Sequence, residues 1–164
     1  MNRSRTLAGQ GREWVFQGGY VDLTASTSRT QEESLRPASL YQELYSEPET
    51  AEHVTYSSDG QGSIPRFDKA GRFTGSGVGT CRSLLEEFRY SVHTLGLPLE
   101  KALLPLTSNP ARILRLHRKG EIRTGADADI LLFSKAALEL HSVVARGRLA
   151  VGEGKPLIKG MFED

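Results

Sequence analysis

The chain has 164 residues, of which 38% are hydrophobic and 25% charged, a composition typical of a folded globular protein and unlike that of a disordered or fibrous one. Lys and Arg number 21 and Asp and Glu 20, so the net charge of +1 provides no overall field to attract nucleic acid or an anionic membrane. These numbers argue against both of those partners.

The sequence also argues against secretion and membrane insertion. It contains no run of about 18 apolar residues, and the basic start is followed by no apolar segment of signal-peptide length. The single cysteine, Cys81, cannot close an internal disulfide, which favours a reducing compartment. We therefore expect a cytoplasmic protein.

The first part of the chain predicts alternating helices and strands. Apolar residues near helical spacing predict a helix over residues 7–16, and alternating apolar and polar residues predict a strand over residues 18–26. Residues 35–45 favour a helix with a proline in its first turn, and the β-branched and aromatic residues of 53–60 favour a second strand. This order indicates two strands joined by a crossover helix.

The middle of the chain predicts a glycine-rich, flexible connection over residues 71–79, followed by the most regular helix pattern in the sequence. The apolar residues of that pattern, three or four positions apart, are Val78, Cys81, Leu84, Leu85, Phe88, Val92 and Leu95. Because Cys81 lies on this face, we expect it to be a small buried hydrophobic residue rather than a nucleophile.

Short helices and then short strands make up the rest. Residues 98–104 and 110–116 predict two helices, the second capped by Ser108 or Asn109 with Pro110 at its first position. Four short strands follow from residue 130, and Gly-Glu-Gly after Val151 predicts a hairpin between the last two.

Spacing alone identifies no complete catalytic or metal site. No two of the four histidines, His53, His93, His117 and His141, lie within five residues of each other, so none forms a metal motif. The loop of residues 75–80 lacks the lysine and the glycine spacing of a phosphate-binding loop. Asp59 follows the end of a predicted strand, where active-site groups gather in parallel α/β proteins, although an aspartate beside glycines is more often a turn former.

A resemblance to a known family rests on several motifs. They are SSDGQGS at residues 57–63, LTSNPA at 106–111, KGEI at 119–122, GADADI at 125–130, Asn2 with Arg3, ARG at 145–147 and KGMFE at 159–163. The Thr-x-Asn-Pro-Ala element of the second motif and the Gly-x-x-Ala-Asp element of the fourth are shared by many members of the amidohydrolase superfamily, which the third motif also resembles. The others make the chain resemble the C-terminal part of the β-aspartyl (isoaspartyl) dipeptidases within that superfamily.

The resemblance implies an α/β fold, with residues 1–117 as the last part of a (β/α)8 barrel and residues 118–164 as strands of a small β domain. It implies a metallopeptidase that hydrolyses β-aspartyl dipeptides at a two-zinc centre, as a homo-oligomer when complete. Asp59 matches the aspartate that binds one zinc, accepts a proton during attack and passes it to the leaving amine. Arg3 matches an arginine that binds the dipeptide's α-carboxylate, and Ser63 a serine beside the polar end of the substrate.

The family's other zinc ligands, four histidines and a carboxylated lysine, have no match in these residues. A catalytic zinc needs about three protein ligands, so we expect this chain to be inactive without a preceding part or a complementary chain. Because two strands cannot close an eight-stranded barrel, we also expect either a compact C-terminal portion with a weakly held N-terminal half or an assembly with another chain. The alternatives are a non-catalytic assembly module derived from an amidohydrolase, and a different amidohydrolase, dihydroorotase-like or deacetylase-like.

Overall fold

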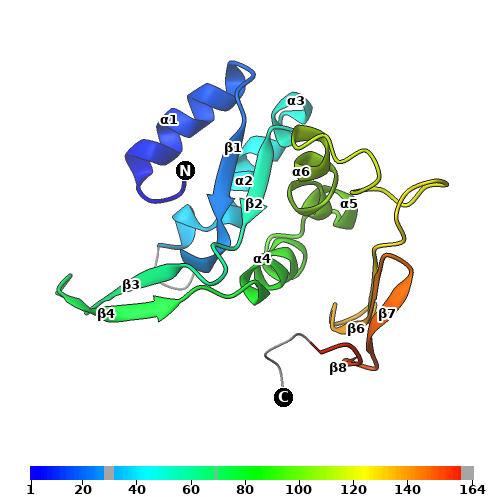
Figure 1. Cartoon of the computed structure of the whole chain (residues 1–164). Helices are drawn as coiled ribbons and strands as arrows, with labels where there is room; N and C mark the ends of the chain where they lie inside the picture. The colour runs from blue at the N-terminus through cyan, green and yellow to red at the C-terminus, as the bar shows by residue number, and fades with distance from the viewer. Residues whose placement is uncertain (28–31, 69, 160–164) are drawn as a thin grey trace. The chain divides into compact units, whose positions relative to one another are not determined.

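The computed structural model describes residues 1–27, 32–68 and 70–159. The chain divides into two compact units, Met1–Pro110 and Ala111–Asp164 (Figure 1). None of the helices in the described ranges is both long and apolar enough to cross a membrane.

The first unit begins with the predicted order of helix, strand, helix and strand, and then continues with a β-hairpin and further helices. Its elements are α1 (Arg5–Phe16), β1 (Val21–Thr24), η1 (Ala25–Thr27), η2 (Glu33–Leu35), α2 (Pro37–Tyr45), α3 (Pro48–Ala51), β2 (Val54–Ser57), β3 (Ser63–Phe67), β4 (Phe73–Val78), α4 (Arg82–His93), α5 (Leu99–Leu103), η3 (Leu104–Leu106) and α6 (Ser108–Ile113). The last of them, α6, begins in this unit and ends in the second one. The strands β1 and β2 pair in parallel, with Val21 opposite Val54 and Thr24 opposite Ser57. The two strands form an open sheet, so the described residues contain no closed barrel.

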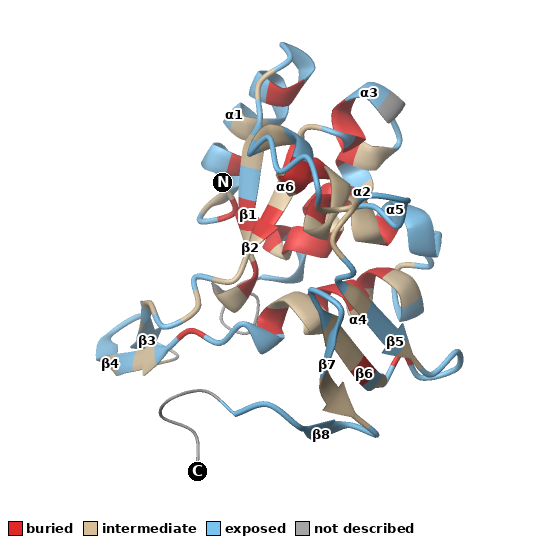
Figure 2. Ribbon diagram, turned by 45° about the vertical axis from the view of Figure 1, so that its right-hand side comes forward, coloured by how far each residue is buried: buried red, intermediate tan, exposed pale blue. Residues whose placement is uncertain are grey.

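The core of this unit lies on one face of the β1–β2 pair. Leu23, Val54 and Tyr56 alternate onto that face and are buried, as are Tyr41 and Leu44 of the crossover helix α2. Figure 2 shows buried positions gathered around β1, β2 and α2. The described buried hydrophobic residues lie mainly in the first unit, most of which is the part that the sequence analysis expects to be weakly held.

Helix α4 has a more polar buried face than its sequence predicts. Its buried residues are Ser83, Glu87, Phe88 and Ser91. The carboxylate of Glu87 accepts bonds from Arg36, at 3.2 Å from Nε and 2.8 Å from Nη2, and from the backbone N–H of Ala38 at 3.2 Å. The guanidinium of Arg36 also lies 3.7 Å from the ring centroid of Tyr90. Because Arg36 gives α2 no side-chain cap, Glu87 provides the oxygen that satisfies a free N–H in its first turn.

The prediction of a flexible connection over residues 71–79 is wrong. Residues 73–78 of that segment form β4, which pairs antiparallel with β3, and the hairpin projects from the rest of the unit (Figures 1 and 2). Asp68 links the two strands, since its Oδ1 accepts hydrogen bonds from the backbone N–H groups of Ala70 and Arg72, each at 2.9 Å. Val78 therefore ends a strand and is 69% exposed, instead of lying on the buried face of α4.

Two other local predictions need correction. Cys81 is exposed, because α4 begins at Arg82, one residue after it. Asn109 lies inside α6 and does not cap it, and Pro110 is the third residue of that helix. The Nδ2 group of Asn109 donates to the carbonyls of Ala51 and Val54, each at 2.8 Å, and so links α6 to the beginning of β2.

The second unit is an antiparallel sheet, in agreement with the short strands that its sequence predicts. The strands β5 (Ile130–Phe133), β6 (Leu140–Ala145), β7 (Arg148–Gly152) and β8 (Lys155–Pro156) are neighbours in chain order. The predicted hairpin is confirmed between β7 and β8. Its two turn residues, Glu153 and Gly154, both have positive φ, 50° and 73°, as a type I′ turn requires.

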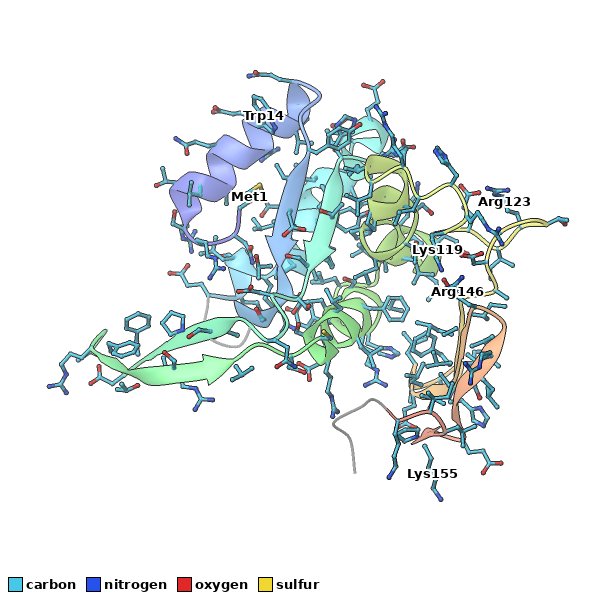
Figure 3. All side chains as sticks on the ribbon, in the orientation of Figure 1. Met1, Trp14, Lys119, Arg123, Arg146 and Lys155 are labelled. Carbon is cyan, nitrogen blue, oxygen red and sulfur yellow. The ribbon has the colours of Figure 1, made fainter. Side chains whose placement is uncertain are left out.

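Lys119 holds together the segment that leads into β5. Its ammonium group pairs with Asp127 at 3.0 Å and with Asp129. Asp129 Oδ1 also accepts the backbone N–H of Arg146, at 2.7 Å, in the turn between β6 and β7. Lys119 and Arg146 are labelled in Figure 3. Asp127 has a second cation, because Arg118 Nη2 lies 2.7 Å from its Oδ1.

We expect Glu87→Gln to lower the free energy of unfolding by about 3 kcal/mol, because it leaves the partly buried Arg36 guanidinium without its counter-charge. Urea unfolding followed by circular dichroism measures this change. The matched control is Glu86→Gln, next to it on α4, whose longer pair with Arg82 is worth less than about 1 kcal/mol. If the two substitutions lowered the free energy of unfolding equally, the role assigned to Glu87 would be contradicted.

We expect the second unit to lose stability in acid through Asp127. The hydrogen bond from Lys119, with the charges of Arg118 and Lys119, holds the pKa of Asp127 below its usual range. A carboxyl group whose pKa is lower in the folded state stabilises the fold above its unfolded pKa of about 3.9, and this contribution is lost as the pH falls through the folded pKa. Asp127→Asn should therefore lower the unfolding temperature at neutral pH, and this difference should shrink as the pH falls through the folded pKa and the Asp127 carboxylate is protonated.

The measurement is thermal unfolding followed by the NMR signals of β5 to β7, with Glu139→Gln as a control for the loss of one exposed carboxylate. The prediction would be contradicted if the unfolding temperature of Asp127→Asn differed from that of the unsubstituted chain by the same amount over the whole pH range.

Candidate active site

Asp59 lies just beyond the carboxyl end of β2, where the sequence predicts it. Its φ of 48° is in the left-handed region, which aspartate tolerates better than most residues. The turn is closed by the N–H of Gly62, which donates to the Asp59 carbonyl at 3.0 Å, and by the N–H of Gly60, which donates to Ser58 Oγ at 3.1 Å. The Asp59 side chain is 45% exposed.

The base of the β3–β4 hairpin encloses this turn. The N–H of Gly79 donates to the carbonyl of Gly62 at 2.8 Å, and the N–H of Gln61 donates to the carbonyl of Gly79 at 3.0 Å. A Cβ atom on Gly79 would lie 2.2 Å from the Asp59 carbonyl oxygen, and one on Gly62 would lie 2.6 Å from Asp59 Oδ1. Both glycines are therefore needed for the close approach of the backbone to Asp59.

Arg3 reaches the same end of the sheet through its buried neighbour Asn2. Asn2 Nδ2 donates to the carbonyls of Thr24, at 3.0 Å, and Leu35, at 3.3 Å, while its Oδ1 accepts the N–H of Thr24 at 2.9 Å. These bonds fix the backbone of residue 2 beside the end of β1. Arg3 Nη2 then lies 3.9 Å from Asp59 Oδ2, in a pair whose side chains are 51% and 45% exposed.

Ser63 is the third residue that the sequence proposes for the site. It is the first residue of β3, is exposed, and lies opposite Val78 at the root of the hairpin. Within the described part of the chain, no hydrogen bond joins Ser63 to Arg3 or Asp59. Among the described residues, the structure therefore pairs Arg3 with Asp59 and leaves Ser63, four residues after Asp59, without a hydrogen bond to either.

Asp22 is a polar residue of this region that the sequence analysis missed. Its carboxylate accepts hydrogen bonds from the hydroxyls of Thr55, at 2.9 Å, and Ser57, at 2.5 Å. All three side chains lie on the face of the β1–β2 pair opposite Leu23 and the core. The alternation of polar and apolar residues in the two strands was the signal that could have identified this face.

The described residues do not by themselves fit a two-metal centre. They contain no group of three or more His, Cys, Asp and Glu side chains placed to hold a metal ion. His53 has structural contacts, since its ring stacks on Tyr20 with centroids 4.6 Å apart and its Nδ1 lies 3.1 Å from the carbonyl oxygen of Gly19. Asp59 can supply one carboxylate ligand, which is fewer than a catalytic zinc requires.

Comparisons with known proteins identify the family of the chain. The amidohydrolase family matches residues 21–153. The β-aspartyl dipeptidase of the thermophilic, keratin-degrading Fervidobacterium islandicum AW-1, solved in complex with β-Asp-Leu dipeptide, is 36% identical with a TM-score of 0.82, over 98% of this chain and 41% of that chain. A second structure of β-aspartyl dipeptidase from that organism gives 32% identity and a TM-score of 0.79, over 98% and 39% of the two chains.

A more distant similarity extends to N-acetylglucosamine-6-phosphate deacetylase from Pasteurella multocida. It is 14% identical with a TM-score of 0.56, over 81% of this chain and 37% of that chain, which shows a shared fold alone. The chain thus spans about two fifths of the length of the dipeptidase structures that it matches. Their similarity over nearly all of its residues, together with the family match, confirms the resemblance: the chain belongs to the amidohydrolase family.

Proposed function

We propose that this chain is the C-terminal portion of a zinc-dependent β-aspartyl dipeptidase, which hydrolyses the isopeptide bond of β-aspartyl dipeptides. The observation that carries the proposal is the pairing of Arg3 with Asp59, 3.9 Å apart, beside the carboxyl ends of β1 and β2. One guanidinium and one carboxylate at that end of the strands provide a substrate anchor and a proton acceptor. The 36% identity to a dipeptidase solved with β-Asp-Leu supports the choice of substrate.

Asp59 serves as the general base. Its carboxylate accepts a proton from the water that attacks the carbonyl carbon of the isopeptide bond, and then gives this proton to the leaving amine. The turn that holds Asp59 supports this role, because the hydrogen bonds and the close glycine contacts fix its backbone while its side chain stays partly open to solvent.

Arg3 binds the α-carboxylate of the dipeptide. The planar guanidinium presents two parallel N–H donors to a carboxylate, which gives orientation as well as affinity. Its pair with Asp59 is long and solvent-exposed, and such pairs contribute only about 0–1 kcal/mol, so substrate can separate them at little cost. Ser63 contributes a hydroxyl for the polar end of the same substrate.

The complete enzyme has two zinc ions in this proposal, and Asp59 supplies one ligand. The other ligands come from outside these 164 residues, either from a preceding part of the same protein or from a complementary chain. Bound zinc makes water acidic enough to supply a nucleophile at neutral pH. We also propose that the complete enzyme is a homo-oligomer and that it lies in the cytoplasm.

A chimera tests the proposal, with these 164 residues in place of the matching part of the Fervidobacterium enzyme. We expect the chimera to hydrolyse β-Asp-Leu, and Asp59→Asn to lower its kcat by about 10²-fold or more, because the proton acceptor is lost. The isolated chain with added zinc should show no turnover. Asp68→Asn in the hairpin turn is the matched control and should leave kcat close to that of the chimera.

Turnover by the isolated chain would overturn the expectation of an incomplete site. A folded chimera whose activity does not change with Asp59→Asn would overturn the role of that residue. A folded chimera without activity would favour the non-catalytic assembly module, and activity on other amides in place of β-Asp-Leu would favour a different amidohydrolase.

Gly79→Ala should displace Asp59 without altering its chemistry. The new methyl group would meet the Asp59 carbonyl oxygen at 2.2 Å, and overpacking of this kind costs about 1–3 kcal/mol or moves the backbone. We expect a kcat at least about tenfold lower in the chimera, since a small displacement of a catalytic group is costly. The control is Gly9→Ala, where nothing lies within 4 Å of the added carbon, and an equal loss of kcat there would contradict the explanation.

A further inference from the structure

A carboxylate joins the two strands of the candidate site. Asp22 of β1 accepts the hydroxyl of Thr55 through Oδ1, at 2.9 Å, and the hydroxyl of Ser57 through Oδ2, at 2.5 Å, so each of its oxygens binds a different residue of β2. The Thr55 hydroxyl lies 3.5 Å from the carbonyl of Val21, which makes Asp22 the nearer of these two acceptors. Asp22 lies opposite Thr55 in the register, and Ser57 is two residues closer to the end of β2. The carboxylate therefore holds two successive positions on one face of that strand.

Ser57 is the point from which the turn of Asp59 starts. It is the last residue of β2 and precedes Asp59 by two residues. Its neighbour Ser58 accepts the N–H of Gly60 at 3.1 Å inside that turn. A displacement of Ser57 would thus be passed through two peptide units to the Asp59 carboxylate, and the hydrogen bond from Ser57 to Asp22 opposes such a displacement.

Arg3 is placed from the other strand. Its neighbour Asn2 binds the backbone of Thr24, the last residue of β1. The substrate anchor of the proposed site is therefore tied to β1, and the proton acceptor, Asp59, to β2. Because Asp22 connects these two strands, its two hydrogen bonds bear directly on the separation between the anchor and the acceptor.

The face that carries Asp22 is the one opposite the core and α2. In a (β/α)8 barrel the helices lie outside the strands, so this face would line the interior of the complete enzyme, below the groups at the carboxyl ends of the strands. Away from bulk water a carboxylate needs hydrogen-bond donors, and its hydrogen bonds are stronger there than in water. The hydroxyls of Thr55 and Ser57 supply these donors.

We propose that Asp22 is a positioning residue for the reaction: through Thr55 and Ser57, its carboxylate holds the end of β2 so that Asp59 stays at a fixed distance from Arg3. This inference rests on the proposed function, because it takes Asp59 as the proton acceptor and Arg3 as the substrate anchor. Asp22 acts through its two hydroxyl partners and not on the substrate. Its removal should therefore lower kcat, which depends on the placement of Asp59, and leave KM nearly unchanged, since Arg3 remains tied to β1.

NMR of the backbone amides tests the link in the full chain, without metal or substrate. Gly60 and Gly62 donate hydrogen bonds inside the turn that follows β2, so their signals report its geometry. We expect Asp22→Ala, which lies on the other strand, to shift both signals. Ser57→Thr keeps the hydroxyl and should leave them close to their original positions. The amide of Gly154, in the second unit, is the internal reference and should not move.

Kinetics of the chimera on β-Asp-Leu then test the role, with each rate divided by the folded fraction from circular dichroism. Asp22→Ala and Ser57→Ala should each lower kcat by about tenfold and leave KM within about twofold, because a small displacement of a catalytic group is costly. The double variant should lose no more than Asp22→Ala alone, because both substitutions remove the same hydrogen bond. Ser57→Thr should keep kcat close to that of the chimera. The matched control is Asp68→Ala, whose Oδ1 also accepts two hydrogen bonds, in the hairpin turn, and which should leave kcat unchanged.

Three results would overturn the proposal. They are unmoved signals of Gly60 and Gly62 in Asp22→Ala, an unchanged kcat in the same variant, and a double variant whose loss of kcat is the product of the two single losses. A chimera that is inactive without any substitution would overturn the proposed function, and the catalytic role of Asp22 with it. In that case a shift of the two amide signals would still show that Asp22 holds the turn, so the two failures are distinguishable.

Discussion

The strands β1 and β2 run in parallel, with Thr24 opposite Ser57. Both strands therefore end at the same edge of their sheet. This register determines which groups can meet. Asn2 binds the backbone of Thr24 and thereby places Arg3 at the end of β1, while Asp59 follows β2 by two residues. An antiparallel pair would have sent these residues to opposite ends, and no guanidinium would face the carboxylate.

The parallel register in turn depends on the crossover between the strands. Helix α2 covers the apolar face of both strands, and its first turn is held by Glu87 of α4 and not by a cap of its own. A buried carboxylate costs free energy to desolvate, and here the charge of Arg36 and the N–H of Ala38 compensate for that cost. The polar interior of α4 is therefore part of the support for the sheet, and thus for the candidate site.

Periodicity predicted most of the elements, because the β1–β2 strands, α2 and the C-terminal hairpins each have a clear apolar pattern or a turn signature. It failed for β4, because a strand with Gly75 and Gly77 has too few side chains to show alternation. Cys81 was wrongly assigned to the buried face because the apolar spacing continues one turn before α4 begins. Asn109 resembles a helix cap in sequence, while its actual partners lie more than 50 residues away.

Local sequence patterns predicted less of the candidate site than of the fold. Strand patterns placed Asp59 at the end of β2, but its chemical role and its pairing with Arg3 depended on the family resemblance, because contacts between distant residues leave no local signal. The polar face around Asp22 was visible in the alternation and was overlooked.

The exposed thiol of Cys81 provides experimental access to the Asp59 turn. Cys81 is the one cysteine in the sequence, its sulfur lies 3.6 Å from Ser58 Oγ, and a methyl group on Gly60 would clash with that sulfur at 2.6 Å. A maleimide fluorophore or a nitroxide spin label would therefore attach at a single position, beside the turn and outside the strands. Its emission or its spectral line shape would report how that turn responds when ligands or other polypeptides are added.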